Sequence, residues 1–230
     1  MEDLKEKLEL HRLWLEDNTK GNKLNLRHAN LSGADFKWVN FIGADLRNAD
    51  LSHAYLRHAY LSSADLSNVD LRYADLRNAD LRNANLRNAN LSYADLRYAN
   101  LSYADLRYAN LSNANLSNAN LSNVDLSNVD LRNADLSYAD LRNANLSGAD
   151  LSGVNLRNCI GNNIEVKSLQ LGTYLVSYTK DILNIGCQSH THSDWRTFSD
   201  SIILDMDGEK ALNWWSLNKH IIFELIDREQ

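Results

Sequence analysis

The chain has 230 residues with 44% apolar content and a formal net charge of −6 at pH 7, enough for one or two folded domains. Its start, MEDLKEKLEL, is charged and no stretch reaches the length of a membrane span, so we expect neither a signal peptide nor a membrane protein. Cys159 and Cys187 are too few for a disulfide framework, which favours the reducing cytoplasm.

Residues 3–16 are expected to form a helix ahead of the rest of the fold. One face of this helix carries residues at helical spacing, namely Leu4, Leu8, His11 and Leu15. Gly21 follows and ends the segment. We interpret His11 as a packed helix residue rather than as a ligand or a catalytic base.

A repeat of five residues then dominates the sequence. From residue 26 to residue 156 every fifth position is leucine or phenylalanine, which makes 27 positions with 25 Leu and 2 Phe. From residue 29 to residue 154, Ala or Val stands two positions before each of them, and Asp or Asn stands between, except at Tyr55 and Tyr60. A period of five fits neither the 3.6 of a helix nor the alternation of a long strand.

Each unit reads as a very short strand followed by a bend. Ala-Asp-Leu alternates as a strand does, with small apolar inside, polar outside and large apolar inside. One such strand buries too little surface to be stable, so the units must coil and stack. The sequence therefore predicts a parallel solenoid with leucines stacked along its axis.

Units such as ANLSG, ADLRN and ANLRN resemble the pentapeptide-repeat proteins over more than half of the chain. The resemblance implies an all-β solenoid, a right-handed quadrilateral parallel β-helix with four pentapeptides per coil. It also implies an N-terminal helix that covers the first coil, where unpaired strand edges would otherwise be exposed. We assign residues 1–23 to this capping helix, 24–171 to the β-helix and 172–230 to a C-terminal capping module.

The outer surface of the predicted coils carries an unusual group of side chains. Stacking at a spacing of 20 brings together a candidate partner-binding face of eight residues: Lys37, Trp38, Tyr55, Arg57, His58, Arg77, Arg97 and Tyr98. His53, Tyr60 and Tyr73 lie at its borders. Aromatic and arginine side chains are enriched at binding hot spots. The alternative is that tyrosine only fills corners of the coil, as four tyrosines between residues 93 and 108 suggest.

The repeat fades after residue 158, where a degenerate last coil is expected to run to about residue 171. Beyond it, TYLVSYT and ILNIGC flank Lys180 and Asp181 and predict a hairpin. A short helix capped by Ser193 or Asp194 and a final helix after Gly208 complete a small α+β cap. The apolar band of the final helix is wide, so we expect it either to fill the module or to join two copies as a homodimer, and we favour the dimer.

Cys187, His190, His192 and Asp194 form a metal-like cluster in this module. Their spacing matches no paired zinc-ligand pattern, so we favour a structural turn and assign no metal, cofactor or catalytic residue.

We therefore expect a non-enzymatic interaction scaffold that binds a protein partner. The alternative is a DNA-mimicking inhibitor or protector of DNA gyrase or topoisomerase, as in one branch of the family that the chain resembles. A DNA mimic needs a strongly acidic face, whereas residues 24–158 hold 14 Asp against 13 Lys and Arg. Binding to a membrane or directly to nucleic acid is not expected.

Overall fold

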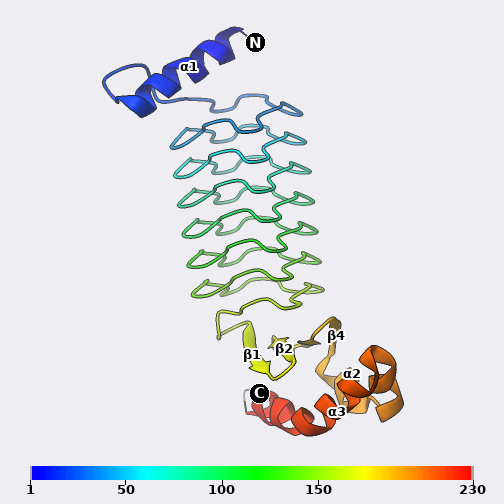
Figure 1. The fold of residues 1–230 in the computed structure, drawn as a ribbon. Helices are drawn as coiled ribbons and strands as arrows, with labels where there is room; N and C mark the ends of the chain where they lie inside the picture. Colours follow the sequence, from blue (N-terminus) through cyan, green and yellow to red (C-terminus); the bar gives the residue numbers. More distant parts are fainter. Residues whose placement is uncertain (1, 229–230) are drawn as a thin grey trace. The chain divides into compact units, whose positions relative to one another are not determined.

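The computed structural model describes residues 2–228, without the side chains of residues 2 and 3 (Figure 1). The chain forms two compact units, Met1–Asn155 and Leu156–Gln230. The first unit begins with helix α1 (Glu2–Glu16) and continues as a stack of coils. The second unit contains four strands and two helices. No helix among the described residues combines the length and the apolar character needed to cross a membrane.

Parallel bridges join residues that are 20 positions apart, from Asn25↔Asp45 to Asp135↔Asn155. Asp45 shows how one outward residue joins its coil to the preceding one. Its N–H donates to the Leu24 carbonyl at 3.0 Å, and its own carbonyl accepts from the Leu26 N–H at 2.8 Å. Four pentapeptides therefore make one coil, as the resemblance implied. On each side of a coil, backbone N–H and C=O groups form hydrogen bonds to the neighbouring coils.

Each corner of a coil is a turn closed by the Ala or Val N–H on the carbonyl of the preceding leucine. At the third residue of the turn φ is positive, for example 57° at Asn78 and 67° at Gly43. Asn and Gly suit this conformation better than other residues, which explains why they fill most corners. The Asp or Asn before each turn also has a local role, because its side chain accepts from the N–H two residues later, as Asp70 does from Arg72 at 3.1 Å.

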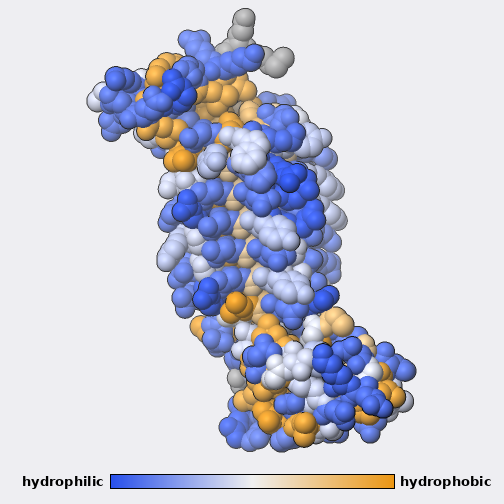
Figure 2. All heavy atoms as spheres, viewed as in Figure 1, coloured by the Kyte–Doolittle hydropathy of each residue, from blue (hydrophilic) through white to orange (hydrophobic). Residues whose placement is uncertain are grey.

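Leucine side chains fill the axis of the coils. From Leu46 to Leu141 every leucine of the series is at most 1% exposed. Figure 2 shows mainly hydrophilic residues over the coils on the face that it presents. Near α1, the rings of Phe36 and Phe41 meet edge to face with their centroids 5.1 Å apart. The two phenylalanines thus supply extra apolar volume at the first coils.

Helix α1 is tied to the first coil by backbone and side-chain hydrogen bonds. The Leu24 N–H donates to His11 Nδ1 at 3.1 Å, and the Asn22 N–H donates to the Leu10 carbonyl at 3.1 Å. Gly21 has φ +67°, and a Cβ there would lie 2.0 Å from the Leu10 carbonyl oxygen. His11 is buried, as predicted, and it acts as the acceptor that holds the start of the repeat under the helix.

The second unit contains an antiparallel sheet in the order β1-β2-β3-β4 (Lys167–Leu171, Tyr174–Tyr178, Ile182–Ile185, Gln188–Thr191). Strands β2 and β3 are the predicted hairpin. Residues 167–171 form β1 and not the last coil of the solenoid, so the range 24–171 given to the β-helix was too long. The reason is Gly172, which has φ +61° and opens a two-residue hairpin loop to β2. Gly186, with φ +57°, does the same between β3 and β4.

Helices α2 (His192–Thr197) and α3 (Asp200–Asp227) pack on this sheet. The N-cap of α2 is Thr191, not Ser193 or Asp194, because Asp194 is the third residue of a capping box with Thr191. We expected the final helix to start after Gly208. Helix α3 instead begins at Asp200 and kinks at Asp207 and Gly208. The indole N–H of Trp195 donates to the Leu183 carbonyl at 2.8 Å, which fixes α2 to β3.

Truncation of a stacked leucine tests which residues of the repeat point into the coil and which point outward. We expect Leu91→Ala to lower the free energy of unfolding by about 2–5 kcal/mol, because the neighbouring leucines cannot collapse into the gap. Asp95→Asn is the matched outer control and should change it by less than about 0.5 kcal/mol, because the asparagine Oδ1 can still accept from the Arg97 N–H. Denaturant melts measure both. Equal losses would mean that inside and outside are reversed.

Acid should weaken the attachment of α1. Burial lowers the pKa of His11 below its ordinary value of 6.5, against a smaller opposing effect of the Ile42 carbonyl, and Lys23 lowers it further. Because the folded state favours neutral His11, its contribution to stability is complete above pH 6.5 and is lost as the pH falls below that value. We expect His11→Gln, which keeps an acceptor for Leu24, to reduce the pH dependence of denaturant melts between about pH 5 and 7. An unchanged pH dependence would contradict this role.

Candidate functional site

The eight residues of the candidate face lie on one side of the coils and on the corner that follows it. Asp35, Tyr55, Asp75 and Asp95 are stacked by successive parallel bridges along this side. Because each basic residue follows its strand residue by two positions, the bridges also bring the basic residues into register: Lys37, Arg57, Arg77 and Arg97. The next positions at the corner are Trp38, His58 and Tyr98, with Asn78 between the last two. We call these eight residues the aromatic-basic face.

A stack of two rings forms the corner of this face. The indole of Trp38 and the imidazole of His58 lie 4.0 Å apart between centroids, with an angle of 7° between their planes. Both residues have positive φ, 62° and 60°. Trp38 is 62% exposed, so burial does not explain a bulky side chain at this strained position.

Two tyrosines flank the turn that presents His58. Tyr55 precedes the turn and Tyr60 follows it, and they are 49% and 44% exposed. Both occupy the position that holds Asp or Asn in the rest of the repeat, where the side chain accepts the hydrogen bond of the turn. A tyrosine side chain cannot make that short-range contact. Lys37 extends over Tyr55, with its Nζ 5.2 Å from the ring centroid.

The basic side chains of the face are less available than the sequence suggested. Arg77 donates to Asp75 through Nε at 2.7 Å and Nη2 at 2.6 Å, and its Nε also lies 3.5 Å from Asp95. Arg97 donates to Asp95 in the same way, with Nη2 at 2.6 Å. Lys37 pairs with Asp35 at 2.9 Å. Three of the four cations are therefore neutralised within their own repeats.

Arg57 differs because Tyr55 stands where its carboxylate would be. Among the residues described, no carboxylate lies within ion-pair distance of Arg57. Arg57 also attracts the Asp75 carboxylate of the next coil electrostatically. The pKa of the Asp75 carboxyl lies below its usual range, mainly because Arg77 donates a hydrogen bond to it, and Arg57 adds a weaker attraction. The face thus combines exposed aromatic rings with one guanidinium that has no carboxylate of its own.

A second aromatic column borders the same side at its other corner. The rings of His53, Tyr73 and Tyr93 stack in sequence, with centroids 4.9 and 5.0 Å apart. Sequence analysis placed His53 and Tyr73 at the border of the face and left out Tyr93. Their regular spacing of 20 residues is the signal that could have identified the column.

The metal-like cluster of the second unit is dispersed over several local contacts. Cys187 is exposed, and the ring of His190 meets the rings of Trp195 and Phe198 edge to face. The Asp194 side chain accepts from the Thr191 N–H, and His192 is buried in α2. Within residues 2–228, no three potential metal ligands lie close enough together to hold an ion.

Comparison with known proteins gives a family match for the repeat. The family model described as pentapeptide repeats matches in eight copies, over residues 22–57, 49–88, 84–123 and 125–160. These ranges cover more than half of the chain. None of the curated protein sequences matches significantly.

Several solved structures are similar to this chain. A pentapeptide repeat protein from the thylakoid lumen of Arabidopsis thaliana is 34% identical over 46% of this chain and 71% of its own, with a TM-score of 0.36. Rfr23, a pentapeptide repeat protein from the cyanobacterium Cyanothece 51142, is 30% identical over 64% and 95%, with a TM-score of 0.26. QnrB1, a plasmid-mediated fluoroquinolone resistance protein, is 22% identical over 60% and 76%, with a TM-score of 0.41.

Replacing Tyr55 by the residue usual at its position tests whether folding requires the tyrosine. Tyr55→Asp should raise the free energy of unfolding by about 0.5–1 kcal/mol, because the carboxylate gains the turn hydrogen bond and a pair with Arg57. Asp75→Tyr is the reciprocal control and should lower it by about 1 kcal/mol, because the turn loses the oxygen that accepts from the Arg77 N–H and Arg77 also loses its carboxylate. Urea melts of both variants give the comparison. A loss of stability in Tyr55→Asp would show that Tyr55 serves the fold.

Proposed function

The chain belongs to the pentapeptide-repeat family, and we propose that it is a non-enzymatic scaffold that binds a protein partner through the aromatic-basic face. Members of the family fold as right-handed quadrilateral β-helices. Such a helix is rigid, and the side chains of its corners and outward strand positions lie on the surface. The observation that carries the proposal is the aromatic corner, where Tyr55 and Tyr60 replace turn-forming Asp or Asn on either side of the Trp38–His58 stack.

Folding alone does not account for these aromatic residues. Asn and Gly fill most corners of the repeat as a whole, and they adopt positive φ with less strain than Trp38. The two tyrosines replace side chains that close turns. Sequence choices that lower local stability are concentrated at functional sites. Exposed Trp, Tyr and Arg together are the residue types that dominate binding energy at protein interfaces.

The leucine-filled axis of the first unit also supports a binding scaffold rather than an enzyme. The axis of the coils is occupied by leucine side chains that are at most 1% exposed from Leu46 to Leu141, so a substrate cannot enter it. The outer surface remains as the place where a partner makes contact. A flat side with two aromatic borders suits a protein surface better than a small substrate.

The alternative function, a DNA-mimicking inhibitor or protector of gyrase, is less well supported by the charges. QnrB1 is a fluoroquinolone resistance protein, but its likeness to this chain is too low to carry its activity over. A DNA mimic requires unpaired acidic groups in series. Here the aspartates that precede an arginine are paired with it, at 2.5–2.7 Å in Asp45, Asp70, Asp80, Asp105, Asp130 and Asp140. Potent inhibition of gyrase supercoiling by the purified protein would reverse this order.

Replacement of three aromatic rings tests the proposed face. Trp38→Ser, Tyr55→Asn and His58→Asn together should abolish capture of the partner in a pull-down from the native cell, because the hot-spot side chains are gone. The melting curve should stay nearly unchanged. Tyr103→Asn is the matched control, since Tyr103 is an equally exposed corner residue outside the face. Undiminished capture by the triple variant, or an equal loss in Tyr103→Asn, would assign the aromatic residues to corner filling.

The second unit is proposed to close the β-helix. Within this unit, Ser177 Oγ of β2 donates to the carbonyl of Leu156, the last leucine of the regular series, at 2.8 Å. Cys159 and Val166 are also fully buried. The homodimer proposed through α3 has less apolar surface available than expected, because Trp214, Trp215, Ile222 and Ile226 are buried in the module. Leu217 and Ile221 remain exposed on α3.

Deletion of residues 209–230 separates capping from dimerisation. If the module closes the β-helix, the truncated protein should aggregate, because the leucines and strand edges of the last coil become exposed. Light scattering measures this. A clean, soluble monomer after deletion would contradict the capping role. A monomer mass of the intact chain at micromolar concentration would remove the homodimer.

A further inference from the structure

Arg57 is the cation of the aromatic-basic face for which the described residues supply no carboxylate. It follows Tyr55 by two positions and directly precedes His58, whose imidazole stacks on the indole of Trp38. Arg57 is exposed, whereas Arg77, which is paired with a carboxylate, is half-buried. Its guanidinium therefore keeps its donors available where the exposed rings of the face are gathered.

The local charge around Arg57 is positive. On three successive coils, the strand residue and the basic residue that follows it are Asp35 and Lys37, Tyr55 and Arg57, and Asp75 and Arg77. The parallel bridges hold these coils in register, so three cations stand beside two carboxylates. The whole chain, in contrast, carries a net charge of −6. An anionic group of a partner is thus attracted to this side and repelled by the chain as a whole, which favours one docking position.

The repeat itself shows how an arginine at this position binds a carboxylate. Arg77, on the next coil, donates to Asp75 through Nε at 2.7 Å and through Nη2 at 2.6 Å. Arg57 occupies the equivalent position, but Tyr55 stands in place of the carboxylate, so both donors are left for a carboxylate from outside. Two parallel N–H donors match the two oxygens of such a group. The Tyr55 ring, which is 49% exposed, offers an apolar surface beside them.

Arg87 is the matched case without aromatic neighbours. Asn85 precedes it, so Arg87 also lacks a carboxylate within its own repeat. Asn85 still closes the turn, because its side chain accepts from the Arg87 N–H at 3.2 Å, and the next corner residue is Asn88. At Arg57 the turn oxygen is missing and rings surround the cation. The combination of a cation with exposed rings, and not an unpaired arginine alone, is what resembles a binding hot spot.

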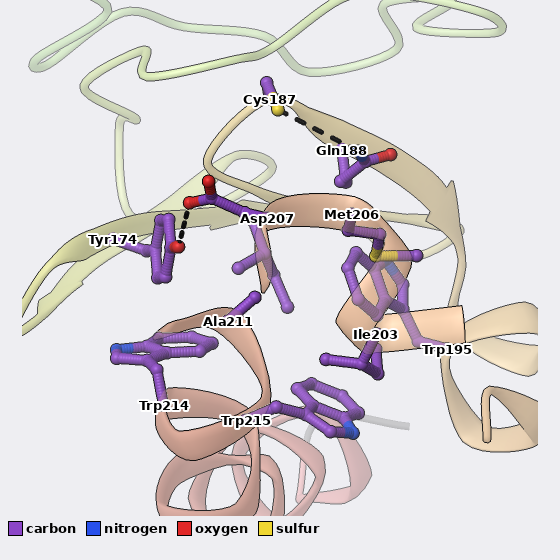
Figure 3. A pocket seen from close by; sticks show the side chains of 11 residues that line it. Tyr174, Cys187, Gln188, Trp195, Ile203, Met206, Asp207, Ala211, Trp214 and Trp215 are labelled. Carbon is purple, nitrogen blue, oxygen red and sulfur yellow. Dashed lines mark hydrogen bonds between the residues drawn. The ribbon is translucent and has the colours of Figure 1, made fainter. Parts of the chain in front are cut away.

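The interior of the second unit offers no comparable place for a partner's side chain. Figure 3 shows a space there that is lined by Tyr174, Trp195, Trp214 and Trp215, among others. This space measures about 40 Å³, which is room for water but too little for an apolar side chain. The surface around Arg57 is open to solvent and needs no such cavity.

We propose that the partner of the aromatic-basic face is a protein segment that presents a glutamate or aspartate beside an apolar side chain. The carboxylate would pair with Arg57, and the apolar group would lie against the exposed rings. This inference rests on the protein-binding function proposed above. A carboxylate suits the site better than a phosphate group, because Asp35 and Asp75 on the adjacent coils repel a second negative charge. The rings would exclude water from the bound ion pair and so strengthen it.

Selection from random peptides tests this class of partner. Short random peptides displayed on phage are selected for binding to the intact chain, and the enriched sequences are then measured as synthetic peptides. We expect the enriched sequences to carry Glu or Asp next to an aromatic or aliphatic residue. Replacement of that acidic residue by glutamine should weaken binding by about tenfold.

Three variants test whether the carboxylate of the peptide lies on Arg57. Arg57→Gln should weaken the acidic peptides as much as the loss of their acidic residue does, and Arg87→Gln, the matched control, should leave their binding unchanged. Arg57→Glu should reverse the preference, so that peptides with lysine in place of the acidic residue bind more tightly than the acidic form. A purely structural role of Arg57 cannot produce this exchange. The melting curves should stay unchanged, because the described residues give Arg57 no ion pair to lose.

Four results would overturn the proposal: no enriched peptide, enriched peptides without an acidic residue, acidic peptides that bind Arg57→Gln as well as the native chain, and tighter binding when phosphoserine replaces the acidic residue. The triple variant Trp38→Ser, Tyr55→Asn and His58→Asn distinguishes this failure from that of the proposed function. Peptides without an acidic residue that bind the native chain but not the triple variant would leave the aromatic-basic face as a protein-binding site. Equal binding of the enriched peptides to the triple variant would remove the face itself.

Discussion

The hydrogen bonds between coils are the constraint on which the first unit depends. Each outward strand residue uses both its N–H and its C=O on the preceding coil, as Asp45 does with Leu24 and Leu26. The flanking Ala44 and Leu46 make the corresponding bonds to the next coil, at Asp65. This fixes the coil at 20 residues and places every leucine above another leucine. Any change of length within a unit would shift all later units out of register. The strict period of five in the sequence is the consequence of this backbone requirement.

The same constraint separates the residues that specify the fold from those that are free to specify a surface. Ala and Leu point inward and tolerate little change, whereas most corner residues are exposed. The position after leucine varies, because its arginines reach solvent while serines such as Ser52 and Ser92 are buried. The outward strand position is less free to vary, because the side chain of its Asp or Asn accepts a hydrogen bond from the following turn. Tyr55 and Tyr60 give up that bond, so their presence carries more information about function than the presence of tyrosine at a corner.

The repeat made most of the first unit predictable from sequence, whereas the second unit depends on contacts that no local pattern shows. The four-sided coil, the buried His11 and the grouping of the eight face residues followed from the period and from the family resemblance. The pairing of Arg77 with Asp75 could also be predicted from the repeat, because the strand Asp and the Arg after the leucine point to the same outer side. Strands β1 and β4 were missed because Gly172 and Gly186 were not recognised as the first residues of two-residue hairpin loops. The kink at Asp207 and Gly208 interrupts a segment whose spacing of apolar residues gives no sign of where it bends.

The two units differ in how their interiors are filled. A coil that stacks one leucine on the next has an axis as wide as one side chain, and identical neighbours fill it without gaps. The interior of such a unit therefore leaves no space for another molecule, and the proposed partner would contact the outer surface. The second unit packs unlike side chains from a sheet and two helices, and tryptophans beside Ala211 cannot fill space as evenly as stacked leucines. The positions of these side chains depend on tertiary contacts, which is why they could not be read from a period in the sequence.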